Sequence, residues 1–230
     1  MILHSKKIGF FIFTHIQKTG GSSLKNFFNV SHLPTCHNTL EKDFKILKND
    51  KPNINLDDVF CFTILRNPWD KMVSYYFYFR QNLPKKKTPP ASKMSFGEWV
   101  KFIYETKENK SWFNSYKSFI SIDGKIRSDY IINFHKYNKE FLLIKSLLGK
   151  HKKVPKVNSS NHDNYKKYYN DSSIEIVKEI YKEDIEYFGY DFNKTSKLIK
   201  PEINKNKILN IFSETYLNQK SSKTTSTPAS

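Results

Sequence analysis

At 230 residues the chain has room for one domain with a substantial core, and its 38% hydrophobic and 16% aromatic residues exclude a disordered protein. Lysine and arginine number 39 against 22 aspartates and glutamates, and the net charge of +17 favours a polyanion or a phosphorylated small molecule as a partner. Cys36 and Cys61 are too few for a disulfide framework and are not spaced as metal ligands, which indicates a reducing compartment.

The N-terminal segment predicts a strand, a tight loop and a helix. Residues 8–15 are a continuous run of β-branched and aromatic side chains, typical of a strand buried on both faces. Gly20-Gly21 follow the run, and Ser22-Ser23 offer an N-cap for a helix over residues 24–30. The apolar run is too short for a membrane span and lacks a cleavage site, so we expect no signal peptide and a cytoplasmic protein.

A second unit of the same kind follows. Residues 59–65 are again apolar and predict a buried strand, which is broken by Arg66-Asn67-Pro68. Pro68 suits the first turn of a helix, which we expect over residues 69–80.

The middle of the chain predicts two more helices and a third strand. The Lys- and Pro-rich residues 83–90 indicate a loop, and residues 96–105 an amphipathic helix. A strand is expected over residues 126–134. A helix over residues 138–148 follows it and is closed by Gly149.

The C-terminal third predicts helices and a tail. Residues 172–175, Ser-Ser-Ile-Glu, resemble a capping box, and the helix that they start runs to about residue 188 before Gly189. A further short helix is expected over residues 203–216. Residues 219–230 carry no large apolar side chain and predict disorder.

Strands that alternate with helices, each strand almost wholly apolar, predict an α/β fold. We expect a P-loop-like three-layer domain with a central, mostly parallel sheet flanked by helices. Ligands of such sheets bind outside the carboxyl ends of the strands. The loops after residues 8–15 and 59–65 both leave such ends, and we therefore consider them together.

The first of these loops has the chemistry of an anion cradle. Its glycines let the backbone approach an anion closely, and the amides at the following helix start are donors. Lys18 adds a positive charge. The pattern differs from a Walker A loop, because Lys18 precedes the glycines. A glycine-rich turn without a ligand is the alternative. The candidate anion-binding residues of the loop are Lys18, Thr19, Gly20, Gly21, Ser22 and Ser23.

The second loop offers a further anion contact. A guanidinium grips a phosphate with two parallel hydrogen bonds, and Arg66 stands at the end of the second strand. Ser74, eight residues later, can converge on the same anion if the loop folds back. Taken alone, Arg66 fits a surface salt bridge better, and Ser74 fits a position on the helix surface better.

Together the two loops resemble the sulfotransferase superfamily, in particular the branch of heparan sulfate 2-O- and 6-O-sulfotransferases and their small bacterial and viral relatives. Residues 15–24, His-Ile-Gln-Lys-Thr-Gly-Gly-Ser-Ser-Leu, are similar to that branch's first motif, with Gln17 in place of a proline. Residues 66–76, from Arg66 to Tyr76, are similar to its second motif. The weaker resemblance extends over residues 8–192, where Asn133 and His135 replace the usual glycine and glutamate.

The resemblance implies a donor, 3′-phosphoadenosine-5′-phosphosulfate, and a role for each matching residue. The Lys18 loop would hold the 5′-phosphosulfate, with Lys18 neutralising the leaving oxygen. Arg66 and Ser74 would hold the 3′-phosphate, and Asn158 and Ser160 would belong to a loop that closes over the nucleotide. No metal is expected.

An acceptor hydroxyl needs a base, and histidine titrates near the working pH. His37 lies between the two motifs, where the relatives carry their base, and is the favoured residue, with Glu41 in reserve. His15 fits a structural role better. The full set of candidates is His15, His32, His37, Glu41, His135, His151 and His162.

The resemblance implies a sulfotransferase domain over residues 1–192, a helical extension over 193–218 and a disordered tail over 219–230. Its acceptor would be the hydroxyl of a carbohydrate, a glycolipid or a small molecule. The alternatives are a nucleotide-binding phosphotransferase, which would need Mg²⁺ and ATP, and a basic nucleic-acid-binding module, which would bind in a salt-sensitive way. We expect no stable nucleic-acid partner.

Overall fold

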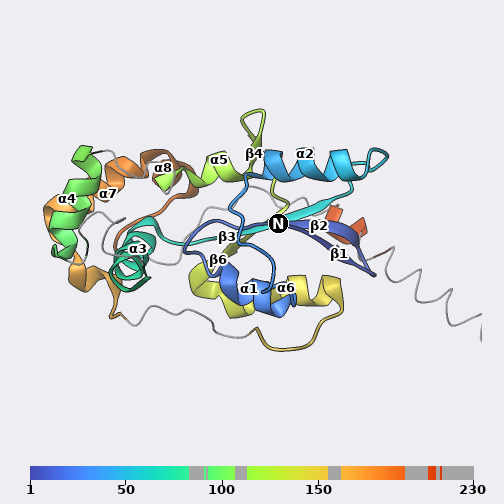
Figure 1. Cartoon of the computed structure of the whole chain (residues 1–230), viewed down its shortest axis with the longest axis horizontal. Coiled ribbons are helices and arrows are strands. Elements are labelled where there is room, and N and C mark those ends of the chain that lie inside the picture. The colour runs from blue at the N-terminus through green and yellow to red at the C-terminus, as the bar shows by residue number, and fades with distance from the viewer. Residues whose placement is uncertain are drawn as a thin grey trace, which may run out of the picture.

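The computed structural model describes residues 1–82, 91, 93–106, 113–154, 162–194, 207–210 and 213. Its centre is a four-stranded sheet in the order β1-β2-β3-β6, shown in Figure 1. The strands are β1 (Ile2–Ser5), β2 (Gly9–Thr14), β3 (Phe60–Leu65) and β6 (Tyr130–Asn133). β2, β3 and β6 are parallel, whereas β1 pairs with β2 in antiparallel fashion. The expected α/β fold with a mostly parallel sheet is confirmed, and β1 is an addition that the sequence analysis missed.

Helices cover both faces of this sheet (Figure 1). On one face α1 (Gly21–Phe27) and α6 (Tyr137–Leu148) pack on the phenylalanines of β2 and β3. On the other face α2 (Leu40–Asp50) and α5 (Tyr116–Ile120) cover the alternate side chains, such as Ile12 and Ile131. The pleat directs successive side chains of a strand to opposite faces of the sheet. Because helices cover both faces, β2 and β3 need apolar side chains at consecutive positions.

A helical lobe stands beside the sheet, at the left of Figure 1. It contains α3 (Pro68–Asn82), α4 (Phe96–Thr106) and α7 (Asp171–Ile180). These helices share an aromatic core around Trp69 and Trp99, which are 3% and 0% exposed. α8 (Lys182–Phe188) continues from α7 and ends at Gly189. The second candidate loop runs directly into α3, so the packing of α3 against the other helices of the lobe fixes the position of that loop.

Several local expectations are confirmed and others are wrong. α6 ends at Gly149 in the left-handed conformation, with φ of +62°, as predicted. The capping box is misplaced in the sequence analysis: Asn170 caps α7, because its side chain accepts from the Ser173 amide while Ser173 Oγ accepts from the Asn170 amide. The chain also breaks at Tyr181, so the expected single helix is two, α7 and α8.

The sequence analysis missed α2 and α5 together with four short elements. These are the hairpin β4 (Ser121–Ile122) and β5 (Lys125–Ile126) and the two 3₁₀ turns η2 (Phe134–Lys136) and η3 (Tyr165–Tyr168). Of them, only η2 takes part in the candidate site.

Residues 207–210 are helical, as expected, and pack on the central domain. Lys207 Nζ donates to the Val59 carbonyl at 2.8 Å and to Asp129 at 3.0 Å, and Ile208 is 8% exposed. The loop expected at residues 83–90 and the tail at 219–230 lie outside the described residues, and the proposed domain boundaries stay predictions. Among the described helices, none combines the length and apolar character needed to cross a bilayer.

Candidate functional site

Three connections leave the same edge of the sheet. Thr14 ends β2, Leu65 ends β3 and Asn133 ends β6, and the register pairs Thr14 with Thr63 and Leu65 with Asn133. Thr63 Oγ1 also donates to the Thr14 carbonyl at 2.9 Å, which ties the ends of β2 and β3 together. The carboxyl ends of parallel strands therefore bring the two candidate loops and η2 to one place.

The loop after β2 is held in an unusual backbone conformation. Lys18 has a φ of +61° and Gly20 a φ of +90°, and the first value is costly for a residue with a side chain. Thr19 is fully buried and its Oγ1 donates to the Ile16 carbonyl at 2.9 Å, so this hydroxyl serves the loop itself. The N-cap of α1 is Gly20, which has no side chain to cover the amides of the first turn. The loop thus presents backbone donors at its tip.

The Lys18 ammonium lies 4.3 Å from the centre of the Tyr78 ring. Burial and, to a lesser extent, the neighbouring Arg66 lower the pKa of Lys18 to about 8. Most Lys18 side chains therefore carry a charge at pH 7, and a bound anion would stabilise that charge further. The repulsion between Lys18 and Arg66 makes this place a candidate site for an anion.

Arg66 is fixed by contacts on three sides. Its Nε donates to Asp70 Oδ2 at 2.7 Å and its Nη2 to Asp70 Oδ1 at 2.9 Å, while its Nη1 donates to the Lys18 carbonyl at 3.1 Å. The Phe134 ring lies 4.4 Å from the guanidinium carbon. Arg66 is only 7% exposed, so it does not form the surface salt bridge that the sequence left open.

These contacts leave one N–H on Nη1 and one on Nη2 without a partner from Asp70 or Lys18, since a guanidinium has five donors. These two N–H groups are candidate donors to a phosphate. Ser74 is 3% exposed and follows Asp70 by four residues on α3, as Asp70 follows Arg66. Asp70 and Ser74 therefore lie on the same side of α3, whereas Arg66 precedes the helix and reaches Asp70 through its side chain.

His15, His37 and Gly21 form a second cluster behind the Lys18 loop. The His15 and His37 rings lie 4.5 Å apart, and the His15 ring stacks on Phe13 at 5.6 Å. A Cβ on Gly21 would lie 1.9 Å from two atoms of the His15 ring. Gly21 is therefore needed for the close approach of His15, in addition to any contact with an anion.

His37 is held in one tautomer. Its Nδ1 lies 2.9 Å from the His15 carbonyl oxygen, which can only accept, so Nδ1 carries the hydrogen and Nε2 of the neutral ring holds a lone pair. Burial lowers the pKa of His37, although the bond to His15 opposes this effect. A neutral imidazole with a fixed, available Nε2 has the properties of a general base.

The other base candidates are placed differently. Glu41 lies in the first turn of α2 and accepts from Lys45 at 2.6 Å, with 47% of its side chain exposed. His32 and His151 are exposed, and His162 stacks on Phe77 in the helical lobe. Only His15, His37 and His135 contact the candidate loops directly in the part of the chain that the structure describes.

Sequence reasoning missed three residues of the site: Asp70, Tyr78 and Phe134. Asp70 stands four residues after Arg66 in a helix, which was a readable signal for an ion pair. Tyr78 contacts Lys18, and Phe134 contacts Arg66, from other elements of the fold. No local sequence pattern predicts these two contacts. Asn158 and Ser160, expected to close over a nucleotide, lie outside the described residues.

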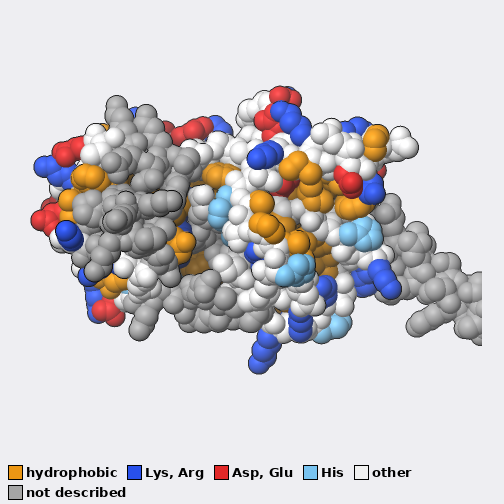
Figure 2. Space-filling view, viewed as in Figure 1, with side chains coloured by type: hydrophobic (Ala, Val, Ile, Leu, Met, Phe, Trp, Pro, Cys, Tyr) orange, Lys and Arg blue, Asp and Glu red, His pale blue; other side chains and the backbone are white. Residues whose placement is uncertain are grey.

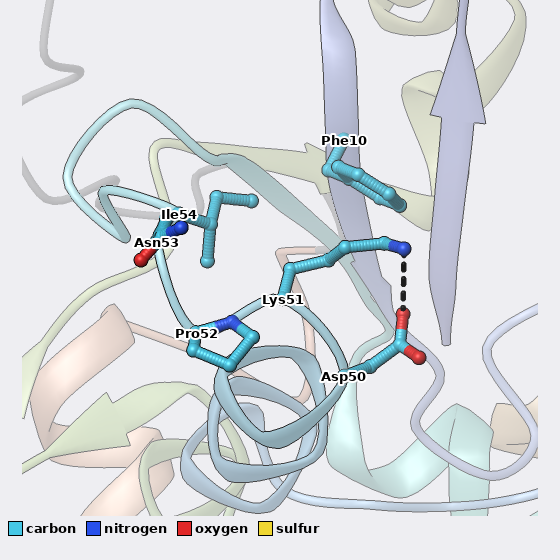
Figure 3. A pocket seen from close by; sticks show the side chains of 6 residues that line it. All are labelled: Phe10, Asp50, Lys51, Pro52, Asn53 and Ile54. Atoms are coloured by element: carbon cyan, nitrogen blue, oxygen red, sulfur yellow. Dashed lines mark ion pairs between the residues drawn. The ribbon is translucent and has the colours of Figure 1, made fainter.

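A pocket of about 330 Å³ lies elsewhere, at the opposite end of β2 (Figure 3). Phe10 and the end of α2 line it, and an ion pair joins Asp50 to Lys51 at 3.6 Å.

Figure 2 shows lysines and arginines gathered along the lower edge of the molecule in that view, over α1 and α6. Among the described residues no cluster of three His, Cys, Asp or Glu side chains could hold a metal ion, and the expected metal-free reaction stays a prediction.

The comparison with family models gives one match, to the sulfotransferase family, over residues 5–191. No curated protein and no solved structure matches the chain. The match spans the three parallel strands β2, β3 and β6, all three connections at their carboxyl ends and the helical lobe. The chain therefore belongs to the sulfotransferase family, whose donor is 3′-phosphoadenosine-5′-phosphosulfate.

Proposed function

We propose that the chain transfers a sulfuryl group from 3′-phosphoadenosine-5′-phosphosulfate to an acceptor hydroxyl, with Lys18 and Arg66 as two anchors for the donor and His37 as the base. The observation that carries this proposal is the hydrogen bond from Arg66 Nη1 to the Lys18 carbonyl. It joins the two anion-binding loops into one site, as a donor with phosphate groups at both ends requires.

The donor's two ends have separate partners in this proposal. The 5′-phosphosulfate lies against the tip of the Lys18 loop, where Gly20, Gly21, Ser22 and Ser23 supply amides and hydroxyls. The 3′-phosphate lies against the free end of the Arg66 guanidinium and the Ser74 hydroxyl. Thr19 supports the loop from within, because its hydroxyl already bonds to Ile16.

The transfer is an in-line displacement. His37 Nε2 takes the proton of the acceptor hydroxyl as the acceptor oxygen forms a bond to sulfur. The bond between sulfur and the 5′-phosphate oxygen breaks, and its electron pair stays with that oxygen. In this proposal Lys18 neutralises the new charge on the leaving group, and its burial supports that role, because a fixed charge stabilises more in a half-buried site than in water. His37 is preferred to Glu41 because it is bonded to the donor loop itself.

The proposed acceptor is a hydroxyl of an anionic sugar compound. The resemblance to glycan sulfotransferases and the net charge of +17 both favour a carbohydrate or glycolipid hydroxyl, on a molecule that carries negative charge. Mass spectrometry of cell extracts incubated with the protein and isotope-labelled donor would identify the species that gains one sulfuryl group.

The donor assignment is tested by binding and transfer together. The wild type is expected to bind adenosine 3′,5′-bisphosphate without Mg²⁺, and Lys18→Ala and Arg66→Ala to lose transfer. Lys101→Ala is a matched control, because Lys101 lies on α4 with 65% of its side chain exposed. Undiminished transfer by both site variants would reject the assignment of these loops. Mg²⁺-dependent ATP binding in place of bisphosphate binding would favour a phosphotransferase.

A further inference from the structure

His135 lies beside the ion pair that orients Arg66. Its Nε2 is 3.4 Å from Asp70 Oδ2, the oxygen that accepts from Arg66 Nε. The η2 turn places the imidazole there, because the Asn133 side chain caps η2 and accepts from the His135 amide at 2.9 Å. Asn133 and His135 are also two of the three positions, with Gln17, at which the chain departs from the motifs that it resembles. Both departures therefore meet at one feature of the structure.

The charges of Arg66 and Asp70 nearly cancel. Arg66 is held by both oxygens of Asp70, so a phosphate that approaches the free end of the guanidinium meets a pair with no net charge. A phosphate monoester carries close to two negative charges at neutral pH. The ion pair with Asp70 orients Arg66 but leaves the negative charge of such a phosphate uncompensated. A further positive charge next to Asp70 would compensate it.

His135 can supply that charge by binding a proton. The charged groups that face it are Asp70 on α3 and Arg66 in the loop before α3, while Lys136 follows it on η2. Burial and Arg66 lower the pKa of His135, and Asp70 opposes them. The imidazole is thus neutral above pH 7 in the free protein. A dianion next to Arg66 would cancel the repulsion from Arg66 and favour the imidazolium.

We propose that His135 is a positioning residue for the donor's 3′-phosphate: it takes up a proton as that phosphate binds and, through Asp70, keeps Arg66 aimed at it. This inference rests on the proposed binding of the 3′-phosphate at Arg66. It adds that the enzyme distinguishes nucleotides with a 3′-phosphate from those without one by a step that depends on pH.

The contacts of Phe134 support this placement. Its ring lies against the Arg66 guanidinium, and a Cβ on Gly20 would lie 3.3 Å from it. η2 therefore contacts both loops that hold the donor. A change in charge at His135 therefore takes place on η2, next to Phe134, which contacts both Arg66 and the Lys18 loop.

Titration calorimetry tests the proposal by measuring proton uptake on binding. At pH 7.5, binding is measured in two buffers of different ionisation enthalpy, with adenosine 3′,5′-bisphosphate and with adenosine 5′-phosphate. Both ligands carry the 5′-phosphate, so uptake at Lys18 is common to them and the difference reports the 3′ end. The wild type should take up more protons with the bisphosphate. His135→Gln should abolish the difference and weaken bisphosphate binding about tenfold, with 5′-phosphate binding unchanged.

The matched control is His4→Gln. His4 is exposed on β1 and packs on Phe10, at the far end of the sheet, so it should leave both affinities and the proton uptake unchanged. Equal proton uptake for the two ligands in the wild type would overturn the proposal, as would equal weakening of both ligands by His135→Gln. Failure of the donor assignment looks different: Arg66→Ala would then bind the bisphosphate as tightly as the wild type.

Discussion

Gly21→Ala is expected to disrupt the donor loop and the base at the same time. The added carbon would lie 1.9 Å from His15 Cδ2 and Nε2 and 2.6 Å from Cε1, whereas nonbonded carbon atoms pack at about 3.5–4.0 Å. The His15 ring cannot move away easily, because it is 4% exposed and lies between Phe13 and His37. Overpacking of a close-packed interior costs about 1–3 kcal/mol.

The matched control is Gly97→Ala, the same substitution in α4. A Cβ there meets its nearest neighbour, Asn170 Nδ2, at 3.4 Å, which is an ordinary contact. Because alanine favours the helix and restricts the unfolded chain, this variant should gain about 0.4–1 kcal/mol. The two substitutions are therefore expected to change stability in opposite directions.

Urea unfolding and bisphosphate affinity measure the outcome. Gly21→Ala should lower the free energy of unfolding by about 1–3 kcal/mol and weaken binding of adenosine 3′,5′-bisphosphate. Gly97→Ala should leave that binding unchanged. If Gly21→Ala unfolded at the wild-type urea concentration and bound the bisphosphate with wild-type affinity, the close approach of His15 to Gly21 would be refuted.

Three further predictions concern the charged groups. His37→Asn should lower kcat about 10²–10⁴-fold with unchanged bisphosphate affinity, in steady-state kinetics and calorimetry, and a smaller effect than Glu41→Gln would reject His37 as the base. The rate should fall on the acid side at a pH below the usual 6.5 of histidine, because the lowered pKa keeps His37 neutral to that point. The rate should fall again above pH 8 as Lys18 loses its proton. A rate that did not change between pH 5 and pH 10 would contradict both assignments. Asp70→Ala leaves the buried Arg66 charge unpaired and should cost about 3–5 kcal/mol in urea unfolding, whereas loss of the exposed partner in Glu105→Ala should cost less than about 1 kcal/mol.

The parts of the fold that could be predicted are those where one physical demand acts on consecutive residues. β2 and β3 are covered on both faces, so their sequences are mostly apolar, with one buried threonine in each strand. Pro68 starts α3 because its fixed φ suits a first turn. α2 carries Leu40, Phe44 and Leu47 on one side, a helical spacing that was present in the sequence and was overlooked.

The details of the site depended on distant residues and could not be predicted in the same way. Arg66 and Lys18 were found from their motifs, but the carbonyl that joins them is 48 positions away from the guanidinium that it binds. The ring of Phe134 and the imidazole of His135 reach the site only because β6 pairs with β3. Contacts of this kind follow from the register of the sheet, which local sequence does not express.

His15 explains why the donor loop and the base are linked. Its carbonyl fixes the tautomer of His37, and its ring packs on Gly21 at the start of α1. A residue with both contacts has to keep one charge state, because a protonated ring would repel a protonated His37 and the Lys25 ammonium nearby. Burial, chiefly, lowers the pKa of His15 to about 3, so its ring is neutral at the pH of about 8 at which Lys18 titrates. The sequence analysis took His15 as structural, and its contacts fit that role: His15 links His37, the proposed base, to the Lys18 loop, and its own ring stays neutral.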